Sequence, residues 1–372
     1  MTGTGFGNSK PQDLGFVLSY RDPAYIRAVT LQEGFRRNAG LAVHDAKNHS
    51  RGLTKYIQSL SRVNRIQKQS KPGLWMINFR GHEVYWPVRW RVGRKARIIF
   101  DELVSPYDAW VNERKTFSSG SLTARVIYAI ERSILRNADL IITDSSFQAD
   151  YYAHLFQVPV EKFRVVRGSV DESAFNQAVQ PRKFDFTEPF VVFTYGTFIP
   201  LQGMDFILSA AELLKDVPVR FLIAGGKGEK LAHFLEVQQS RALTNITHIP
   251  WIDFTALPSY IRGASLCLGG PFGNTAQAQR VITGKALQFL ACGCPTVIGL
   301  SRETGEIFTD RKNCLLVDQG NPGAIAAAID WAFRNPKDLA AIGDEGRRVY
   351  DAYYSMEVLT SSLASLLPMV MQ

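Results

Sequence analysis

Two cations, Arg280 and Lys285, flank the point where a glycine-containing loop passes into a predicted helix that begins near Thr283. A positive side chain at a helix N-terminus is unfavourable unless an anion also binds there. Phosphate oxygens suit both cations, since the forked guanidinium of Arg binds phosphate bidentately. We therefore expect a diphosphate at this junction, with the amide of Gln288, one turn further along, within reach of sugar hydroxyls.

The same apolar stretch, GKALQFLACGCPTVIG, also contains two of the four cysteines of the chain. Cys292 and Cys294 are one residue apart, and no His stands near them to complete a tetrahedral metal site. Free Cys usually behaves as a small buried hydrophobe. Metal or redox chemistry is therefore not expected here, and Gly293 and Pro295 account for the end of the helix.

Two glycine-containing turns precede this stretch. YGTFIPLQGMD, with Gly196 and Gly203, and AGGKGEK, with Gly225 and Gly226, each follow a predicted strand. Glycines at such turns let backbone N–H groups approach a phosphate beside a helix N-terminus. An ordinary strand-to-helix turn explains them equally well, and AGGKGEK is not a P-loop, because the Gly-Lys-Ser/Thr ending is missing.

The first half of the chain offers candidates for acid–base chemistry. The turn NFRGHEVYWP contains Arg80, His82 and Glu83, and the turn FDELVSPYD contains Asp101 and Glu102. His82 is the preferred hydrogen-bonding or acid–base group, and Asp101 is the second candidate. A single His is more often structural, so both interpretations stay open. Asp139 and Asp144 lie at the two ends of the predicted strand near 140–145, and we expect them to be capping or turn residues.

The elements that must position these residues alternate between short apolar strands and amphipathic helices. Strands that are apolar on both faces are typical of buried parallel sheets, so each half predicts a Rossmann-like, doubly wound α/β domain. The prolines and the lack of periodicity in 173–189 indicate a linker. We expect domains at 1–178 and 179–350 and a C-terminal helix within 351–372. The predicted strands are 14–20, 41–46, 74–79, 96–103, 140–145 and 163–168, then 190–196, 220–226, 265–270, 295–300 and 314–317.

The net charge of +9 is concentrated in the first half, where residues 1–180 contain 26 Lys and Arg against 16 Asp and Glu. This imbalance favours an anionic partner such as a membrane surface or an acidic acceptor. Nucleic acid is not expected, because no RRM, helix-turn-helix or zinc-finger pattern occurs. No apolar run reaches the roughly 18 residues of a membrane span, and no signal-peptide pattern opens the chain, so we expect a cytoplasmic protein.

Aromatic and basic residues alternate in VYWPVRWRVGRKAR. Such a composition suits the headgroup layer of an anionic membrane. A solvated basic helix with its Trp side chains in the core explains it equally well. The candidate membrane contacts are Trp86, Arg89, Trp90, Arg91, Arg94 and Lys95.

Several motifs in order resemble the donor domain of family-4 GT-B glycosyltransferases. They are VVFTYGTFIPLQGMDFILSAAELL, VRFLIAGGKGE, PSYIRGASLCL and GKALQFLACGCPTVIG followed by ETGEIFTDRKNCLLV, with FRVVRGSVDESAF similar to the junction before that domain. The resemblance implies two Rossmann-like domains facing across a cleft, with the C-terminal helix crossing back to the first. It also implies transfer of a hexose from a nucleotide-diphosphate sugar, with retention, to a glycan or lipid-linked acceptor of the cell envelope.

The resemblance implies no bound metal or other cofactor, and no Asp-x-Asp motif occurs. It places Thr197 and Gln202 where the family usually has the Arg and Lys that hold the diphosphate. It places Arg280 and Gln288 where the family has two Glu residues. These departures leave open a catalytically degenerate relative that binds a nucleotide sugar or acts as a scaffold. The implied nucleoside contacts are Gly225, Gly226, Trp251, Ile252 and Gln288.

Overall fold

The computed structural model describes residues 12–20, 22, 24–38 and 40–371. The chain divides into two compact units, which are described separately below. The first contains the residues up to Arg167 together with those from Leu359 onward, and the second runs from Gly168 to Val358. Among the described residues, no helix is long and apolar enough to cross a membrane.

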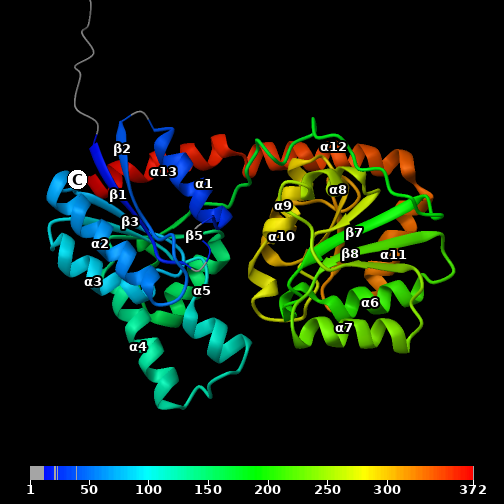
Figure 1. Cartoon of the computed structure of the whole chain (residues 1–372), viewed down its shortest axis with the longest axis horizontal. Helices are drawn as coiled ribbons and strands as arrows, with labels where there is room; N and C mark the ends of the chain where they lie inside the picture. The colour runs from blue at the N-terminus through cyan, green and yellow to red at the C-terminus, as the bar shows by residue number, and fades with distance from the viewer. Residues whose placement is uncertain (1–11, 21, 23, 39, 372) are drawn as a thin grey trace, which may run out of the picture. The chain divides into compact units, whose positions relative to one another are not determined.

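The first unit is a parallel sheet with helices packed against it (Figure 1). Its strands are β1 (Gln12–Leu18), β2 (Leu41–Lys47), β3 (Leu74–Ile77), β4 (Arg97–Asp101), β5 (Leu140–Thr143) and β6 (Phe163–Val165). Its helices are α1 (Ile26–Arg36), α2 (Thr54–Gln69), α3 (His82–Val92), α4 (Leu122–Asn137), α5 (Ser146–Phe156) and most of α13 (Met356–Met371).

The strand order of this sheet is β2-β1-β3-β4-β5-β6, and every pairing is parallel. The chain leaves β1 toward β2 and then crosses back to β3 on the other side. Because parallel strands all point the same way, the turns after β3 and β4, which contain His82 and Glu102, lie at the same edge of the sheet.

The C-terminal helix α13 packs on α1. A Cβ at Gly34 of α1 would meet the side-chain ends of Leu359 and Leu363 of α13 at less than 3 Å, so the two helices approach closely at this glycine. Leu363 is fully buried, and Figure 1 shows α13 running alongside α1. The predicted return of the C-terminal helix to the first domain is therefore present.

The second unit has the same construction. Its strands are β7 (Phe190–Gly196), β8 (Val219–Gly225), β9 (Ile246–Ile249), β10 (Leu266–Leu268), β11 (Thr296–Leu300) and β12 (Leu315–Asp318). Its helices are α6 (Met204–Leu213), α7 (Glu229–Ser240), α8 (Leu257–Gly263), α9 (Gly284–Ala291), α10 (Arg302–Ile307), α11 (Pro322–Arg334) and α12 (Pro336–Tyr353). The parallel order is β12-β11-β10-β7-β8-β9.

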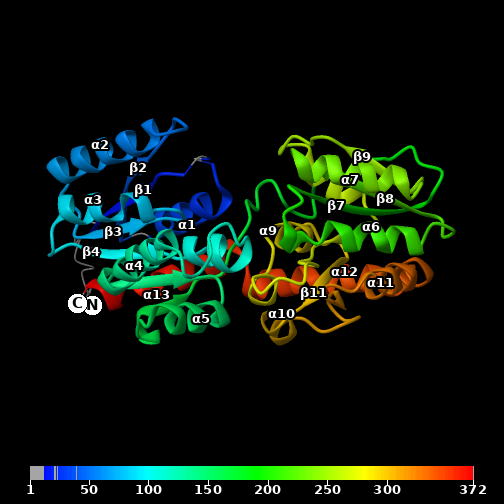
Figure 2. The ribbon, with the colours of Figure 1, turned by 90° about the horizontal axis from the view of Figure 1, so that it is seen from below.

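Alternate residues of β7 enter two different cores, as a strand buried on both faces requires. Phe190 and Val192 join the core that contains residues of α6, α7 and α11. Val191 and Phe193 join the core that contains residues of α8, α9 and α12. In Figures 1 and 2, α6 and α7 lie together close to β7 and β8.

The two predicted Rossmann-like domains are confirmed, with three differences in detail. The strand β9 was not predicted, because only Ile246 of its four residues is buried and no apolar alternation marks it. The pattern DFTALPSYIRGA predicts a helix over 253–264, whereas α8 begins only at Leu257. The predicted linker lacks regular structure, but residue 178 lies inside the second unit, because Val170 and Phe175 are buried in its core.

Candidate donor site and the acidic cluster of the first unit

The carboxyl edge of the second sheet has a topological switch point between β7 and β10. From β7 the chain moves outward to β8 and β9, and it then returns to β10 on the other side of β7. In open α/β sheets, ligands bind outside the carboxyl ends of the strands at such a point. The loops after these two strands contain the predicted diphosphate candidates.

Lys285, in the first turn of α9, lies at this switch point. The residue is only 6% exposed, and its Nζ donates a hydrogen bond of 3.0 Å to Thr194 Oγ1 in β7. Thr194 in turn donates to the carbonyl of Leu268 at the end of β10. Burial lowers the pKa of Lys285 to about 7. In the described part of the chain no carboxylate forms an ion pair with this ammonium, so its charge lacks a counter-ion.

The N-terminus of α9 is fixed at the same edge. Thr283 caps the helix by accepting from the N–H of Ala286, and its hydroxyl donates to the carbonyl of Gly269, just after β10, at 2.7 Å. The backbone at Gly284 is open, since a side chain there would meet nothing within 4 Å. The free N–H groups of the first turn therefore add a partial positive charge beside the Lys285 ammonium.

The predicted glycines are positions of close backbone approach. Gly196 and Gly225 pair across β7 and β8, and a Cβ at Gly225 would lie 2.2 Å from the carbonyl oxygen of Gly196. Gly226 donates its N–H to that oxygen. Gly203 has a φ of +65°, and a Cβ there would meet the carbonyl carbon of Phe272 at 2.5 Å. The loop after β7 is therefore held against the loop after β10.

Two polar side chains of the predicted site have protein partners. Gln288 is buried in α9, and its Oε1 accepts a hydrogen bond from the Tyr195 hydroxyl. Gln202 folds back over Gly196, where a Cβ would lie 2.5 Å from its Nε2. Sequence reasoning missed Tyr195 and Thr194, because 93 and 91 residues separate them from their partners in α9.

The remaining predicted donor contacts lie on loops. Arg280 is half-buried at the end of a short 3-10 helix, Ala278–Arg280, ahead of α9. Trp251 follows β9, is 75% exposed and donates its indole N–H to Asp253. Thr197 is exposed directly after β7, and Ile252 packs at the edge of the core.

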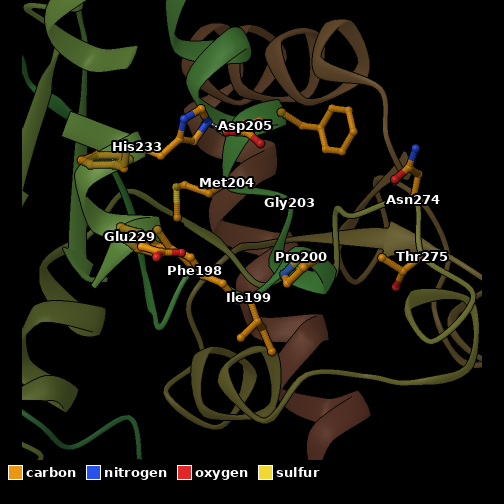
Figure 3. Close-up of a pocket in the computed structure, with 13 residues that line it drawn as sticks. Phe198, Ile199, Pro200, Gly203, Met204, Asp205, Glu229, His233, Asn274 and Thr275 are labelled. Atoms are coloured by element: carbon orange, nitrogen blue, oxygen red, sulfur yellow. Dashed lines mark hydrogen bonds and ion pairs between the residues drawn. The ribbon is translucent and has the colours of Figure 1, made fainter. Parts of the chain in front are cut away.

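A cavity of about 410 Å³ lies beside this edge, between the loop after β7 and the helices α6 and α7 (Figure 3). Gly203, Asp205 and His233 line it. His233 Nε2 lies 3.1 Å from Asp205 Oδ1. Asn274 and Thr275 of the loop after β10 complete one side. The other predicted diphosphate residues do not line this cavity.

In the first unit, the turn after β3 brings His82 to Glu102. Arg80 adopts a strained φ of +60°, and Gly81 packs so tightly on Ile77 and the carbonyl of Asn78 that a Cβ would meet them at 2.3 and 2.7 Å. The turn places His82 Nε2 3.0 Å from Glu102 Oε2.

Glu131 of α4 stands next to this pair, and these three residues, His82, Glu102 and Glu131, are named the acidic cluster below. Burial lowers the pKa of His82 and raises that of Glu102 to about 8. Burial, with the neighbouring Glu102, raises the pKa of Glu131 well above its usual range. The imidazole nitrogen and carboxylate oxygens of the acidic cluster can bind either a shared proton or a metal ion.

Asp101, the second predicted catalytic residue, is fully buried in an ion pair. Arg27 of α1 donates to both carboxylate oxygens of Asp101 at 2.9 to 3.0 Å and also to the carbonyl of Val166. With both oxygens engaged and no exposure, this carboxylate suits a structural link among α1, β4 and the end of β6.

Asp139, predicted as a capping or turn residue, accepts hydrogen bonds from Arg89, Arg97 and the N–H of Ile98. Asp144, at the end of β5, has one buried oxygen without a partner. Burial raises the pKa of Asp144 to about 6.

The predicted membrane contacts divide into exposed and buried residues. Arg89 is buried and bound to Asn137, Asp139 and the carbonyls of Gly93 and Ala96, so its prediction as a surface contact is wrong. Trp86 is half-buried and donates to Ser133 of α4. The others are exposed, with Trp90 at 75%: Trp90, Arg91, Arg94 and Lys95.

Comparison with known proteins places this geometry in a class. Sucrose-phosphate synthase from Thermosynechococcus elongatus superposes with a TM-score of 0.73 at 17% identity, over 97% of this chain and 99% of that one. Anabaena HepE in complex with UDP-glucose superposes with a TM-score of 0.72 at 12% identity, over 96% and 99%. At these identities the likeness shows the fold, which is that of the GT-B glycosyltransferases.

The family follows from the sequence of the second unit. Residues 176–349 match the family model of glycosyl transferases group 1, so the resemblance of this part of the chain to that family is confirmed. The chain is also 26% identical over 235 residues to the GDP-mannose-dependent alpha-(1-6)-phosphatidylinositol monomannoside mannosyltransferase of Mycolicibacterium smegmatis. That match covers 58% of each protein, so the chain spans less than two thirds of this relative's length.

Proposed function

We propose that the protein is a glycosyltransferase that binds a nucleotide-diphosphate sugar in its second unit and transfers the hexose to an acceptor. The observation that supports this most strongly is Lys285 at the switch point of the second unit, a buried ammonium that has no carboxylate partner among the residues that the structure describes. A buried charge is costly unless a counter-charge is supplied. The diphosphate of the donor supplies it when bound.

The donor diphosphate is proposed to bind without a metal. The Lys285 ammonium, the N-terminus of α9 and Arg280 offer positive charge at one edge of the sheet, which is the role that a cation otherwise plays for a leaving diphosphate. The glycine loop from Gly196 to Gly203 lets backbone N–H groups approach the phosphates.

The nucleoside is proposed to lie further along the same edge. Gly225, Gly226 and Trp251 follow β8 and β9, and the exposed indole of Trp251 offers a stacking surface. The amide of Gln288, oriented by Tyr195, retains N–H groups for the ribose hydroxyls. Retention of anomeric configuration belongs to this proposal through the resemblance alone.

The acceptor is proposed to be a lipid-linked or glycan acceptor of the cell envelope, reached at the inner face of a membrane. The relative from Mycolicibacterium smegmatis acts, by its name, on a phosphatidylinositol monomannoside. In this chain, α3 and α4 lie side by side (Figures 1 and 2). The exposed apolar side chains are Trp90 of α3 and Leu122, Val126 and Ile130 of α4, and the cations Arg91, Arg94 and Lys95 are exposed at the end of α3 and just after it. This combination suits an anionic interface.

The experiment that tests donor binding is isothermal titration calorimetry with UDP, GDP and ADP. We expect one nucleoside diphosphate to bind the wild type, and Lys285→Met to weaken it by roughly tenfold or more, as the loss of a charge-assisted hydrogen bond predicts. Lys215→Met is the matched control, because Lys215 is an exposed lysine that precedes β8 and so lies at the opposite, amino edge of the sheet. Equal affinities in wild type and both variants would remove Lys285 from the site.

Turnover is tested separately, with the matching nucleotide sugar and membrane lipid extract as acceptor. We expect sugar transfer that persists after EDTA treatment, and an α-linked product from an α-linked donor by NMR. Tight nucleotide binding without transfer would favour the degenerate relative, for which the replacements Thr197, Gln202 and Gln288 give the specific reason.

A further inference from the structure

The acidic cluster joins three elements of the first unit in a buried position. His82 is the first residue of α3, Glu102 follows β4, and Glu131 lies in the third turn of α4. One ligand-type atom from each of the three residues lies within 4.8 Å of the other two. Three side chains from separate elements thus converge on one small volume.

Each member of the acidic cluster keeps a buried polar atom for which the described part of the chain offers no hydrogen-bond partner within normal geometry. Glu102 and Glu131 are 0% and 1% exposed, and the side chain of His82 is 8% exposed. The unsatisfied atoms are His82 Nδ1, Glu102 Oε1 and Glu131 Oε1. Buried polar atoms are nearly always paired. A hydrogen bond between the carboxyl groups of Glu102 and Glu131 can pair these two residues through a shared proton, and a bound ion in place of that proton would engage all three residues.

The surroundings do not balance two carboxylates. Arg80 is the cation whose charge acts on Glu102. Its guanidinium lies 3.8 Å from the carboxylate of Glu83, which is not a member of the acidic cluster. Glu131 Oε2 accepts from the N–H of Tyr107, which is a neutral donor. Burial favours the protonated forms of Glu102 and Glu131 in the absence of an ion. A divalent cation that displaces these protons would be neutralised by the two resulting carboxylates, with a neutral imidazole as the third ligand.

The donor types select the class of cation. Ca²⁺ and Mg²⁺ prefer oxygen ligands alone, whereas imidazole combined with carboxylates suits first-row transition metals such as Zn²⁺. The 3.0 Å between His82 Nε2 and Glu102 Oε2 is compatible with two ligands on one ion at about 2.0–2.2 Å each.

The cluster opens onto a cavity of about 190 Å³, which His82 and Glu131 line together with Pro106, Trp110, Ile127 and Ile130. Three protein ligands leave a fourth coordination position, as sites that bind a water or a substrate oxygen do. Apart from Glu83, the remaining side chains that line this cavity are apolar or aromatic.

We propose that His82, Glu102 and Glu131 bind one divalent transition-metal ion, with Zn²⁺ as the preferred ion, in the first unit. The site goes beyond the proposed function, because donor binding rests on residues of the second unit alone. It gives His82 the role of a metal ligand in place of an acid or base. The ion's open position faces the apolar cavity and takes an oxygen ligand there.

The test uses the full chain after removal of metal with EDTA. Equilibrium dialysis against Zn²⁺ followed by elemental analysis should give one ion per chain, and Co²⁺ in its place should give visible ligand-field absorption. Glu131→Gln, which keeps the side-chain shape, should weaken binding at least tenfold, and so should Glu102→Gln. Glu83→Gln is the matched control, since Glu83 lines the same cavity outside the acidic cluster and should leave binding unchanged.

A melting-temperature measurement separates lost binding from lost folding. Zn²⁺ should raise the Tm of the wild type and of Glu83→Gln but not that of Glu131→Gln, with all three folded in the absence of metal. Failure of the wild type to bind stoichiometric Zn²⁺ or Co²⁺ would overturn the proposal and identify the cluster as a carboxyl pair that shares protons. Binding that Glu131→Gln and Glu102→Gln leave intact would overturn it as well. Neither result affects nucleotide binding to the second unit.

Discussion

Lys285 shows how a single residue can be unfavourable for the fold and favourable for binding. Its ammonium is buried beside Thr194, and no carboxylate in the described ranges of the chain pairs with it. Burial lowers the pKa of Lys285 to about 7 from the ordinary value of 10.5. Such a group is retained at a cost in stability when it serves a ligand. A bound diphosphate reverses the effect, because an adjacent negative charge favours the protonated amine.

The stability cost gives a prediction with a defined pH dependence. Between about pH 7 and 10.5 the folded state binds fewer protons at Lys285 than the unfolded state does, so the free energy of unfolding of the wild type rises with pH in this window. We expect Lys285→Met to raise the free energy of unfolding by about 1–3 kcal/mol near neutral pH, since one pKa unit corresponds to about 1.4 kcal/mol. The gain should shrink steadily toward pH 10.5.

Urea unfolding of wild type and Lys285→Met at several pH values measures this difference. Lys215→Met should show no gain at any pH, because Lys215 is exposed. A stabilisation of Lys285→Met that is the same at neutral pH and near pH 10.5, or a net destabilisation at neutral pH, would contradict the account of an uncompensated buried charge.

At the residue scale, the sequence indicated which side chains to consider but not their partners. A cation in the first turn of α9 was predicted to serve a phosphate, and that remains a prediction. The pairing of Asp101 with Arg27, 74 residues away, was invisible, because an ion pair between distant segments leaves no local pattern. Arg89 was assigned to the surface for the same reason, since its partners Asn137 and Asp139 lie on another element.

At the scale of elements, the loop after β7 is held by contacts that only glycine permits. Gly203 combines a φ of +65° with an approach of 2.5 Å between a hypothetical Cβ and the backbone of Phe272. We expect Gly203→Ala to lower the free energy of unfolding by about 1–3 kcal/mol, the usual cost of a non-glycine residue in a left-handed conformation. Nucleotide affinity should fall as well, because the loop must move away from β10.

Thermal unfolding and calorimetry with the nucleoside diphosphate measure both effects. Gly73→Ala is the control, since no atom lies within 4 Å of its Cβ and its φ is not in the left-handed region. If Gly203→Ala and Gly73→Ala behaved alike in both measurements, the backbone contact with Phe272 would not hold the loop.

Most elements could be predicted because buried parallel strands have a distinctive composition. All six strands of the first sheet and five of the second overlap the predicted ranges, although β2, with the sequence LAVHDAK, is mostly half-buried. β9 is an edge strand with three half-buried residues, so its composition resembles that of a loop. The unit boundary was placed too late, because the irregular backbone near residue 178 says nothing about the burial of Phe175.

At the scale of the whole molecule, the basic charge of the first half predicts association with anionic membranes. The exposed residues on α3 and just after it provide the test, because each Lys or Arg near an anionic surface contributes about 1 kcal/mol. We expect the double variant Arg94→Ser with Lys95→Ser to bind anionic vesicles roughly 30-fold more weakly than the wild type at low salt. Vesicle sedimentation over a range of lipid concentrations measures this.

The matched control removes two exposed lysines from the second unit, Lys215→Ser with Lys312→Ser, and so lowers the net charge by the same amount. Its vesicle affinity should stay close to that of the wild type. If both double variants lost vesicle affinity equally, net charge alone would explain the binding. If the wild type did not bind anionic vesicles, the membrane proposal would be wrong.

The central claim is that a donor diphosphate completes the charge balance of Lys285 at the switch point between β7 and β10. A crystal structure with the nucleoside diphosphate that binds in calorimetry tests this most directly. We expect a phosphate oxygen within hydrogen-bonding distance of Lys285 Nζ and of backbone N–H groups at the start of α9. A nucleotide whose phosphates lie instead in the cavity between α6 and α7, away from Lys285, would contradict the account.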